Sequence, residues 1–404
     1  AAWDAVSPGA PLARTEAGRF LSTFRQYDAA RPLLREAIEQ LPAWGEPRLL
    51  LGLMEMQSGR DDLAAAVLRE AARIDPFNAR LANSLALIEE LQDYARIETE
   101  HFVVRYRDGE DAVLASMMAE PLEAMHAEFV ARFGTEPDRR TVIELMPDHP
   151  RFAVRITGMP RLFTIAACTG PVIAMEVPRE GPRSRHLGTF DWLRVMRHEY
   201  AHTVTLAATD NRIPHWLTEG AAVTMESAPR AWSDCLMLAQ ALNSGELFTL
   251  DEIKWGFVRP RTPQQRSLAY AQSQWMFEFM TERWGREAVG DLLSRYREGL
   301  RESEAFPAAL GVDRETFFRR FTAWAREQVA AWGLAPEPSL RTLVAARGER
   351  ILREEPEPAA EGPGSTVDTM PVGEEDAAGD AGGADRDAAG EDGPPPLTPP
   401  TRAV

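Results

Sequence analysis

Cysteine and long apolar runs are scarce in this chain of 404 residues. The two cysteines, Cys168 and Cys235, have neither metal-ligand spacing nor a neighbouring histidine motif that would mark a nucleophile. We expect two buried or half-buried thiols, and the sequence leaves open whether they form one disulfide. No apolar run approaches the roughly 18 residues that span a bilayer, and no signal peptide is visible at Ala1. We therefore expect no membrane span in this chain.

Lysine is scarcer still, because Lys254 is the only one and arginine carries nearly all of the positive charge. The formal net charge is −17; residues 354–404 hold 13 acids and 2 bases, a net of −11, so about −6 belongs to the rest of the chain. This balance argues against nucleic-acid binding, which needs a basic face. Residues 354–404 also hold very few large apolar side chains, which predicts disorder.

Histidine is rare as well, with seven in the chain, yet two stand four residues apart in the segment His198-Glu199-Tyr200-Ala201-His202. On a helix, positions i and i+4 share one face, so His198 and His202 can offer two imidazole nitrogens to one metal ion. Glu199 can reach a water on that metal without being a ligand, which suits a general base. This H-E-x-x-H segment would arise by chance in roughly one such chain in a hundred, so alone it is a moderate signal.

Glu219 lies 17 residues after His202 and is the candidate third ligand. The gap allows the first helix to end, a loop to turn at Asp210-Asn211, and a second helix to begin near Pro214. Glu219 then falls about one turn into this helix and can point back at the histidines. Two imidazoles and one carboxylate leave a fourth position for water, as in catalytic zinc sites. The alternative for Glu219 alone is a solvated helix glutamate.

Together, H-E-x-x-H and the later W-x-x-E-G-x-A segment, which starts at Trp216, resemble the gluzincin metallopeptidases, specifically the bacterial peptidase MA-like family. The likeness covers about residues 98–330. It implies zinc bound by His198, His202 and Glu219, Glu199 as the base, and a peptide or protein substrate. The compartment stays open between the bacterial cytoplasm and periplasm, because two cysteines suit both.

Peptide hydrolysis at such a site needs a further donor to the tetrahedral oxyanion. Tyr270 is our candidate for this donor. The alternative, which fits the sequence equally well, is that Tyr270 only packs in the core as a half-buried side chain. Residues 171–177 read as a strand, which either pairs with an extended substrate at a sheet edge or lies inside the sheet. The family pattern has no histidine at the position of His215. We interpret His215 as a polar residue at the start of a helix, rather than as a partner of the metal ligands or an electrophile.

The N-terminal part carries a repeat with a period of 34 that resembles tetratricopeptide repeats, in which small residues let two helices approach. A third unit supplies one helix, from Leu81 to Leu91. Such arrays bind partner proteins, but one this short favours a packing platform. Either this array packs against the following domain or further repeats preceded Ala1. Because the chain starts without Met, we expect a fragment or a processed product. The matching positions are Gly18 and Gly52, Asp28 and Asp62, Ala30 and Ala64, Leu34–Ala37 and Leu68–Ala71, and Pro42 and Pro76.

The predicted fold class is α+β: a zincin-like peptidase domain with a small sheet and a helical lobe, preceded by an all-α repeat segment and followed by a disordered acidic tail. The predicted domains are residues 1–97, the repeats; 98–335, the gluzincin-type metallopeptidase; and 336–404, a linker and the tail. Strands are expected at 102–106 and 141–145, and helices at 111–133, 232–243, 263–283, 287–299 and 314–332.

Three functions fit this sequence. The leading hypothesis is an active zinc metallopeptidase. The main alternative is a catalytically inactive scaffold whose helical repeats bind a partner protein, and the third is zinc-dependent hydrolysis of a bond other than a peptide. The three intact ligands together with Glu199 favour the enzyme, because a site that has lost catalysis does not need the general base.

Overall fold

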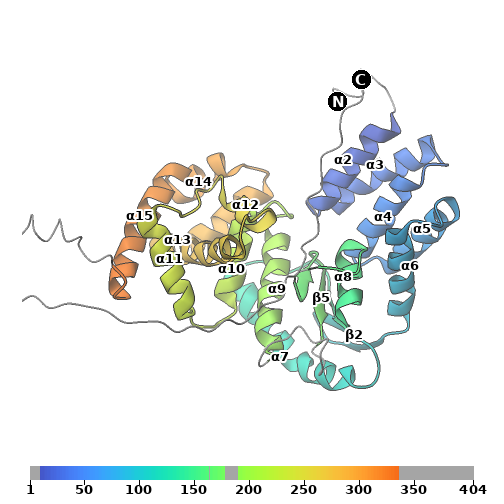
Figure 1. Cartoon of the computed structure of the whole chain (residues 1–404), viewed down its shortest axis with the longest axis horizontal. Coiled ribbons are helices and arrows are strands. Elements are labelled where there is room, and N and C mark those ends of the chain that lie inside the picture. Colours follow the sequence, from blue (N-terminus) through green and yellow to red (C-terminus); the bar gives the residue numbers. More distant parts are fainter. Residues whose placement is uncertain (1–9, 163, 178–189, 336–404) are drawn as a thin grey trace, which may run out of the picture. The chain divides into compact units, whose positions relative to one another are not determined.

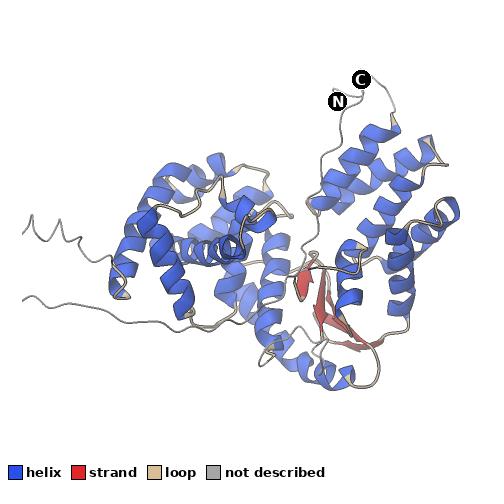
Figure 2. Cartoon of the chain, in the orientation of Figure 1, coloured by secondary structure: helices blue, strands red, loops and turns tan. Residues whose placement is uncertain are grey.

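The structure is a computed structural model, and it describes residues 10–162, 164–177 and 190–335 (Figure 1). The described residues belong to one compact unit that ends at Glu337. In this part of the chain helices dominate, and one five-stranded sheet lies among them (Figure 2), which confirms the predicted α+β class. The linker and tail predicted at 336–404 lie outside the described residues. Among the helices described, none has the length and apolar character that crossing a membrane requires.

The helices of residues 10–92 reproduce the sequence period. They are α2 (Pro11–Thr23), α3 (Tyr27–Gln40), α4 (Gly45–Gln57), α5 (Asp61–Ile74) and α6 (Ala79–Gln92), so α4 and α5 follow α2 and α3 by 34 residues at both ends. In each pair a glycine lies against a leucine of the partner helix. A Cβ atom on Gly18 would lie 2.6 Å from Leu34, and one on Gly52 would lie 2.5 Å from Leu68. The repeated glycine therefore permits the close approach of the two helices.

The strands of the sheet run in the order β1 (Ala95–Glu98), β2 (Phe102–Tyr106), β3 (Thr141–Met146), β5 (Val172–Glu176) and β4 (Ala166–Cys168). The three inner strands are parallel, and β1 and β4 pair antiparallel at the edges. The strand predicted at 171–177 exists as β5, but it lies inside the sheet. The interpretation of this strand as an edge that pairs with a substrate is therefore wrong.

The repeats pack against one face of the sheet. For so short an array we expected either this packing or further repeats before Ala1. Helix α6 contacts α8 (His149–Thr157), and one apolar core joins residues of α4, α5 and α6 to Phe152 of α8 and Ala174 of β5. The buried hydroxyl of Tyr27 also donates a hydrogen bond to the carbonyl of Thr169, at 2.8 Å. These contacts support the packing role for the array.

The other face of the sheet carries α7 (Asp111–Phe133) and α9 (Trp192–Ala208) (Figure 1). Helix α9 in turn contacts two C-terminal helices, α10 (His215–Met225) and α13 (Pro263–Arg297). The helices predicted at 263–283 and 287–299 meet at Gly285, whose φ of 78° breaks the helical conformation within α13. Both cysteines are buried, as expected, and both are free, which answers the question of a disulfide that the sequence left open. The C-terminal helices are α10 (His215–Met225), α11 (Trp232–Ser244), α12 (Ile253–Val258), α13 (Pro263–Arg297), α14 (Glu302–Leu310) and α15 (Arg314–Ala331).

Candidate metal centre

Helix α9 presents His198 and His202 on one face, one turn apart. The helix begins where the Asp191 side chain accepts a hydrogen bond from the backbone N–H of Arg194, at 3.0 Å. Its sheet-facing side is buried, which fixes the direction in which the two imidazoles point. Their Nε2 atoms lie 3.2 Å apart.

Glu219 completes the group from α10. The chain turns between the two helices at Asp210 and Asn211, which both have positive φ, and Pro214 lies just before the first residue of α10. Glu219 Oε2 is 3.4 Å from Nε2 of His198 and 3.5 Å from Nε2 of His202. The structure thus brings together the three side chains that the sequence indicated as ligands.

Glu226 determines which nitrogen of His198 faces inward. His198 Nδ1 lies 2.9 Å from Glu226 Oε1, and because an ionised carboxylate only accepts, Nδ1 carries the hydrogen. Burial lowers the pKa of His198, but the hydrogen bonds with Glu219 and Glu226 outweigh burial and raise this pKa to about 10. In the absence of a metal, a proton therefore supplies positive charge to the centre.

Two threonine hydroxyl groups determine which nitrogen of His202 faces inward. The Thr205 hydroxyl donates to the carbonyl of Ala201 at 2.7 Å, so it can only accept from Thr218, whose hydroxyl lies 2.9 Å away. The Thr218 oxygen is then left to accept the hydrogen on Nδ1 of His202, at 2.8 Å. Nε2 of His202 therefore presents a lone pair to the centre.

These residues fit a divalent metal. Glu219 Oε2 is buried, and no hydrogen-bond partner for it lies among the described residues. Burial raises the pKa of Glu219, but the nearby imidazoles of His202, His198 and His215 lower it well below its usual range, so the carboxylate stays ionised. Once His198 gives up its Nε2 proton, three acceptor atoms converge on a point where a cation satisfies all of them. Two imidazoles and one carboxylate are a set of ligands that zinc favours.

Glu199 is buried beside this group, with 8% of its surface exposed. Burial raises the pKa of its carboxyl group, and although the charges of His198 and His202 lower it, the net direction is upward. Arg25, from the turn between α2 and α3, is another charge that lowers it. A carboxyl group with a raised pKa suits a general base that works near neutral pH.

Tyr270 and His215 both lie at this centre. Tyr270 belongs to α13, and its ring lies 6.5 Å from the ring of His198, centre to centre. Burial and the charges of Glu219 and Glu199 raise the pKa of Tyr270, so its hydroxyl keeps its hydrogen. His215 is the first residue of α10, as expected, but its interpretation as only a polar helix-start residue is incomplete. Its Nε2 lies 3.0 Å from Glu219 Oε1, whereas the close contacts with His198 and His202 are made by Oε2.

Sequence reasoning missed Glu226 and Thr218 as partners of the two histidines. Glu226 could have been found, because it lies seven residues, or two helical turns, after Glu219 and thus on the same face. Thr218 carried no such signal. Its role depends on the angle at which α10 crosses α9, which the sequence does not state.

Comparison with known families agrees with this geometry. Residues 187–327 match the Peptidase MA superfamily. The match includes α9, α10 and α13, and therefore the three candidate ligands, Glu199, Tyr270 and the partners of the histidines, but not Arg25. Residues 98–186, for which we expected the same likeness, lie outside it. No curated protein matches the chain.

Proposed function

We propose that this chain, whose residues 187–327 match the Peptidase MA superfamily, is a zinc-dependent peptidase of the gluzincin type. The observation that carries the proposal is the convergence of two histidine Nε2 atoms and a buried glutamate oxygen that has no hydrogen-bond partner among the described residues, with Glu199 buried beside them. The ligands would be His198, His202 and Glu219. A scaffold that had lost catalysis would gain nothing from a buried carboxyl group at Glu199, because burying an ionisable group is costly.

The residues of the centre have distinct roles in this mechanism. Bound zinc supplies a Lewis acid that favours ionisation of water near neutral pH. Glu199 takes the proton of the attacking water and returns it to the leaving amine. The Tyr270 hydroxyl donates to the oxyanion that develops on the scissile carbonyl. Glu226 and Thr218 keep both histidines in the tautomer that presents Nε2.

Metal content tests the ligand set. Elemental mass spectrometry of the purified chain should show that Glu219→Ala binds about one zinc less per chain than the wild type. Glu120→Ala, which removes an exposed glutamate of α7, should bind as much zinc as the wild type. Equal zinc in the wild type and Glu219→Ala, with circular dichroism showing that both are folded, would exclude this centre as a zinc site.

Hydrolysis of a peptide library tests the chemistry separately. Glu199→Gln should keep its zinc and lose about 10²–10⁴-fold in kcat. Tyr270→Phe should lower kcat by about 10²-fold or more while KM stays unchanged, because the hydroxyl acts on the oxyanion alone. A wild type that holds zinc but cleaves no peptide would instead support the scaffold alternative, in which the repeats bind a partner.

A further inference from the structure

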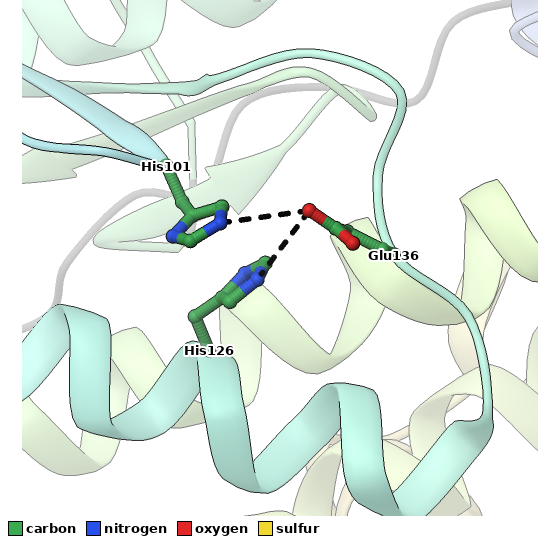
Figure 3. A group of neighbouring side chains, drawn as sticks. All are labelled: His101, His126 and Glu136. Atoms are coloured by element: carbon green, nitrogen blue, oxygen red, sulfur yellow. Dashed lines mark ion pairs between the residues drawn. The ribbon is translucent and has the colours of Figure 1, made fainter.

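A second group of ligand-type side chains lies outside the centre described above. It consists of His101, just before β2, His126 on α7, and Glu136 in the turn that follows α7 (Figure 3). Nε2 of His101 is 3.5 Å and Nε2 of His126 is 3.9 Å from the same oxygen, Oε1 of Glu136. These spacings resemble the 3.4 Å and 3.5 Å between Glu219 and its two histidines. Three separate elements of the fold therefore bring one carboxylate and two imidazoles to a common point.

The other ring nitrogens of both histidines are already engaged. His101 Nδ1 lies 2.6 Å from Glu123 Oε2, and the other oxygen of Glu123 accepts the backbone N–H of His101, at 2.9 Å. Because that carboxylate only accepts, Nδ1 carries the hydrogen and Nε2 of His101 is left to face Glu136. His126 Nδ1 lies 2.6 Å from the Tyr200 hydroxyl. Metal-binding histidines show this pattern, in which a carboxylate or hydroxyl fixes the ring through its second nitrogen.

We propose that His101, His126 and Glu136 form a second metal site, which takes zinc or a similar divalent transition ion. Two imidazoles exclude the hard cations that prefer oxygen ligands throughout, such as calcium and magnesium. The two rings are stacked, with centres 3.6 Å apart, so both nitrogens reach one ion only if it lies between the rings and Glu136. A cavity of about 280 Å³ opens here, and it gives an ion access and leaves room for water as a fourth ligand.

The charge around this cavity favours a cation. Besides Glu136, the carboxylates of Glu100 and Glu123 lie within 4.0 Å and 2.6 Å of the His101 ring nitrogens. Two arginines also line the cavity, and both are engaged elsewhere: Arg140 with Glu98 and with the carbonyl of Glu100, and Arg139 with the carbonyl of Ser58. An ordinary pair of one histidine and one glutamate would explain a single contact. It does not explain two stacked imidazoles that face one oxygen, each anchored through its second nitrogen.

A metal at this position would fix the sheet to the helix of the first centre. Tyr200, which holds His126, is buried and directly follows Glu199 on α9. The ion would thus join the start of β2, α7 and α9. This second site does not depend on the proposed peptidase activity, because it shares no ligand with the first centre.

Zinc titration of the metal-free full chain tests the proposal. Isothermal calorimetry should give two zinc ions per wild-type chain and one per Glu136→Gln chain, or an affinity at the second site at least about 10-fold weaker in this variant. Glu136 is exposed and lies in a turn, so this variant should fold. Glu120→Gln, on the exposed side of α7, is the matched control and should keep two ions.

Glu219→Gln separates the two sites. This variant should keep one zinc ion, and the combined Glu136→Gln and Glu219→Gln chain should keep none. Saturating zinc should raise the Tm of Glu219→Gln by several degrees and leave that of the double variant unchanged, because only an ion bound to the native state stabilises it. An unchanged stoichiometry and affinity in Glu136→Gln, or equal zinc in the single and double variants, would overturn the second site. Neither result would bear on the first.

Discussion

At the scale of single residues, the candidate centre depends on hydrogen positions as much as on ligand identity. The H-E-x-x-H spacing places two imidazoles on one face, but it does not determine which nitrogen of each ring faces the metal. Glu226 and the Thr218 hydroxyl make that choice, since each accepts a hydrogen from an Nδ1 atom. Both partners lie on or directly after α10, so this second helix supplies not only Glu219 but also the groups that orient the two histidines.

Zinc binding at this centre should release a proton. Hydrogen bonds with Glu219 and Glu226 raise the pKa of His198 to about 10 in the metal-free protein, so at pH 8 the imidazole carries a proton that zinc must displace. Affinity should therefore rise with pH up to about 10. Calorimetric titrations at pH 8 in buffers of different ionisation enthalpy should differ by about one proton per ion bound at this centre, measured in the Glu136→Gln chain. Identical heats in all buffers would contradict the raised pKa.

At the scale of helices and strands, the sequence predicts what is long and periodic. The period of 34, the helix at 111–133 and the strands β2 and β3 all carry regular apolar patterns, and all are present. Strands β1 and β4, of four and three residues, and the six-residue helix α12 are too short to show a period, and each was missed.

The order of the strands in the sheet was not predicted either, for a different reason. Strand β5 follows β4 in the chain but lies between β3 and β4 in the sheet. Whether a strand is an edge depends on pairing between distant segments, which one sequence does not state. For this reason residues 172–176 fitted equally well as an edge and as an interior strand. The grouping of His198, His202 and Glu219 was predictable, because these three side chains come from two neighbouring helices joined by a short turn.

Gly220 shows how tightly one pair of helices supports the centre. It follows Glu219 on α10, and a Cβ atom there would lie 2.3 Å from the backbone oxygen of Ser273 on α13. Gly220→Ala should push the two helices apart, cost about 1–3 kcal/mol of stability, and weaken zinc binding by moving Glu219. Thermal unfolding and zinc titration measure both effects.

Gly290→Ala is the matched control for this substitution. Gly290 also lies in a helix, α13, but among the described residues no atom outside its own stretch of helix lies within 4 Å of the position of a Cβ atom there. This change should raise stability by about 0.5–1 kcal/mol, since alanine is the better helix former, and leave zinc binding unchanged. Equal effects of the two substitutions would show that the approach of α10 to α13 does not position Glu219.

At the scale of the whole molecule, a chain of charged groups joins the repeats to the sheet. Asp61 of α5 accepts a hydrogen bond from Arg105 of β2, which lies 3.5 Å from Glu144 of β3. Glu144 in turn accepts from Arg155 of α8, and both of these side chains are fully buried. Burial raises the pKa of Glu144, and the charge of Arg155 opposes that rise. Four elements thus depend on one network, so the repeats and the sheet should unfold together.

Asp61→Asn tests that cooperativity, because it leaves Arg105 without its nearest carboxylate. Breaking such a pair costs about 3–5 kcal/mol when it is buried. Asp62→Asn, at the exposed neighbouring position, should cost less than about 0.5 kcal/mol. Of ten tryptophans, eight lie between Trp192 and Trp332, so fluorescence reports mainly on the C-terminal helices, whereas far-ultraviolet dichroism reports on all helices. In urea, Asp61→Asn should lower both midpoints equally; a fluorescence midpoint that stays at the wild-type value would show that the repeats unfold separately.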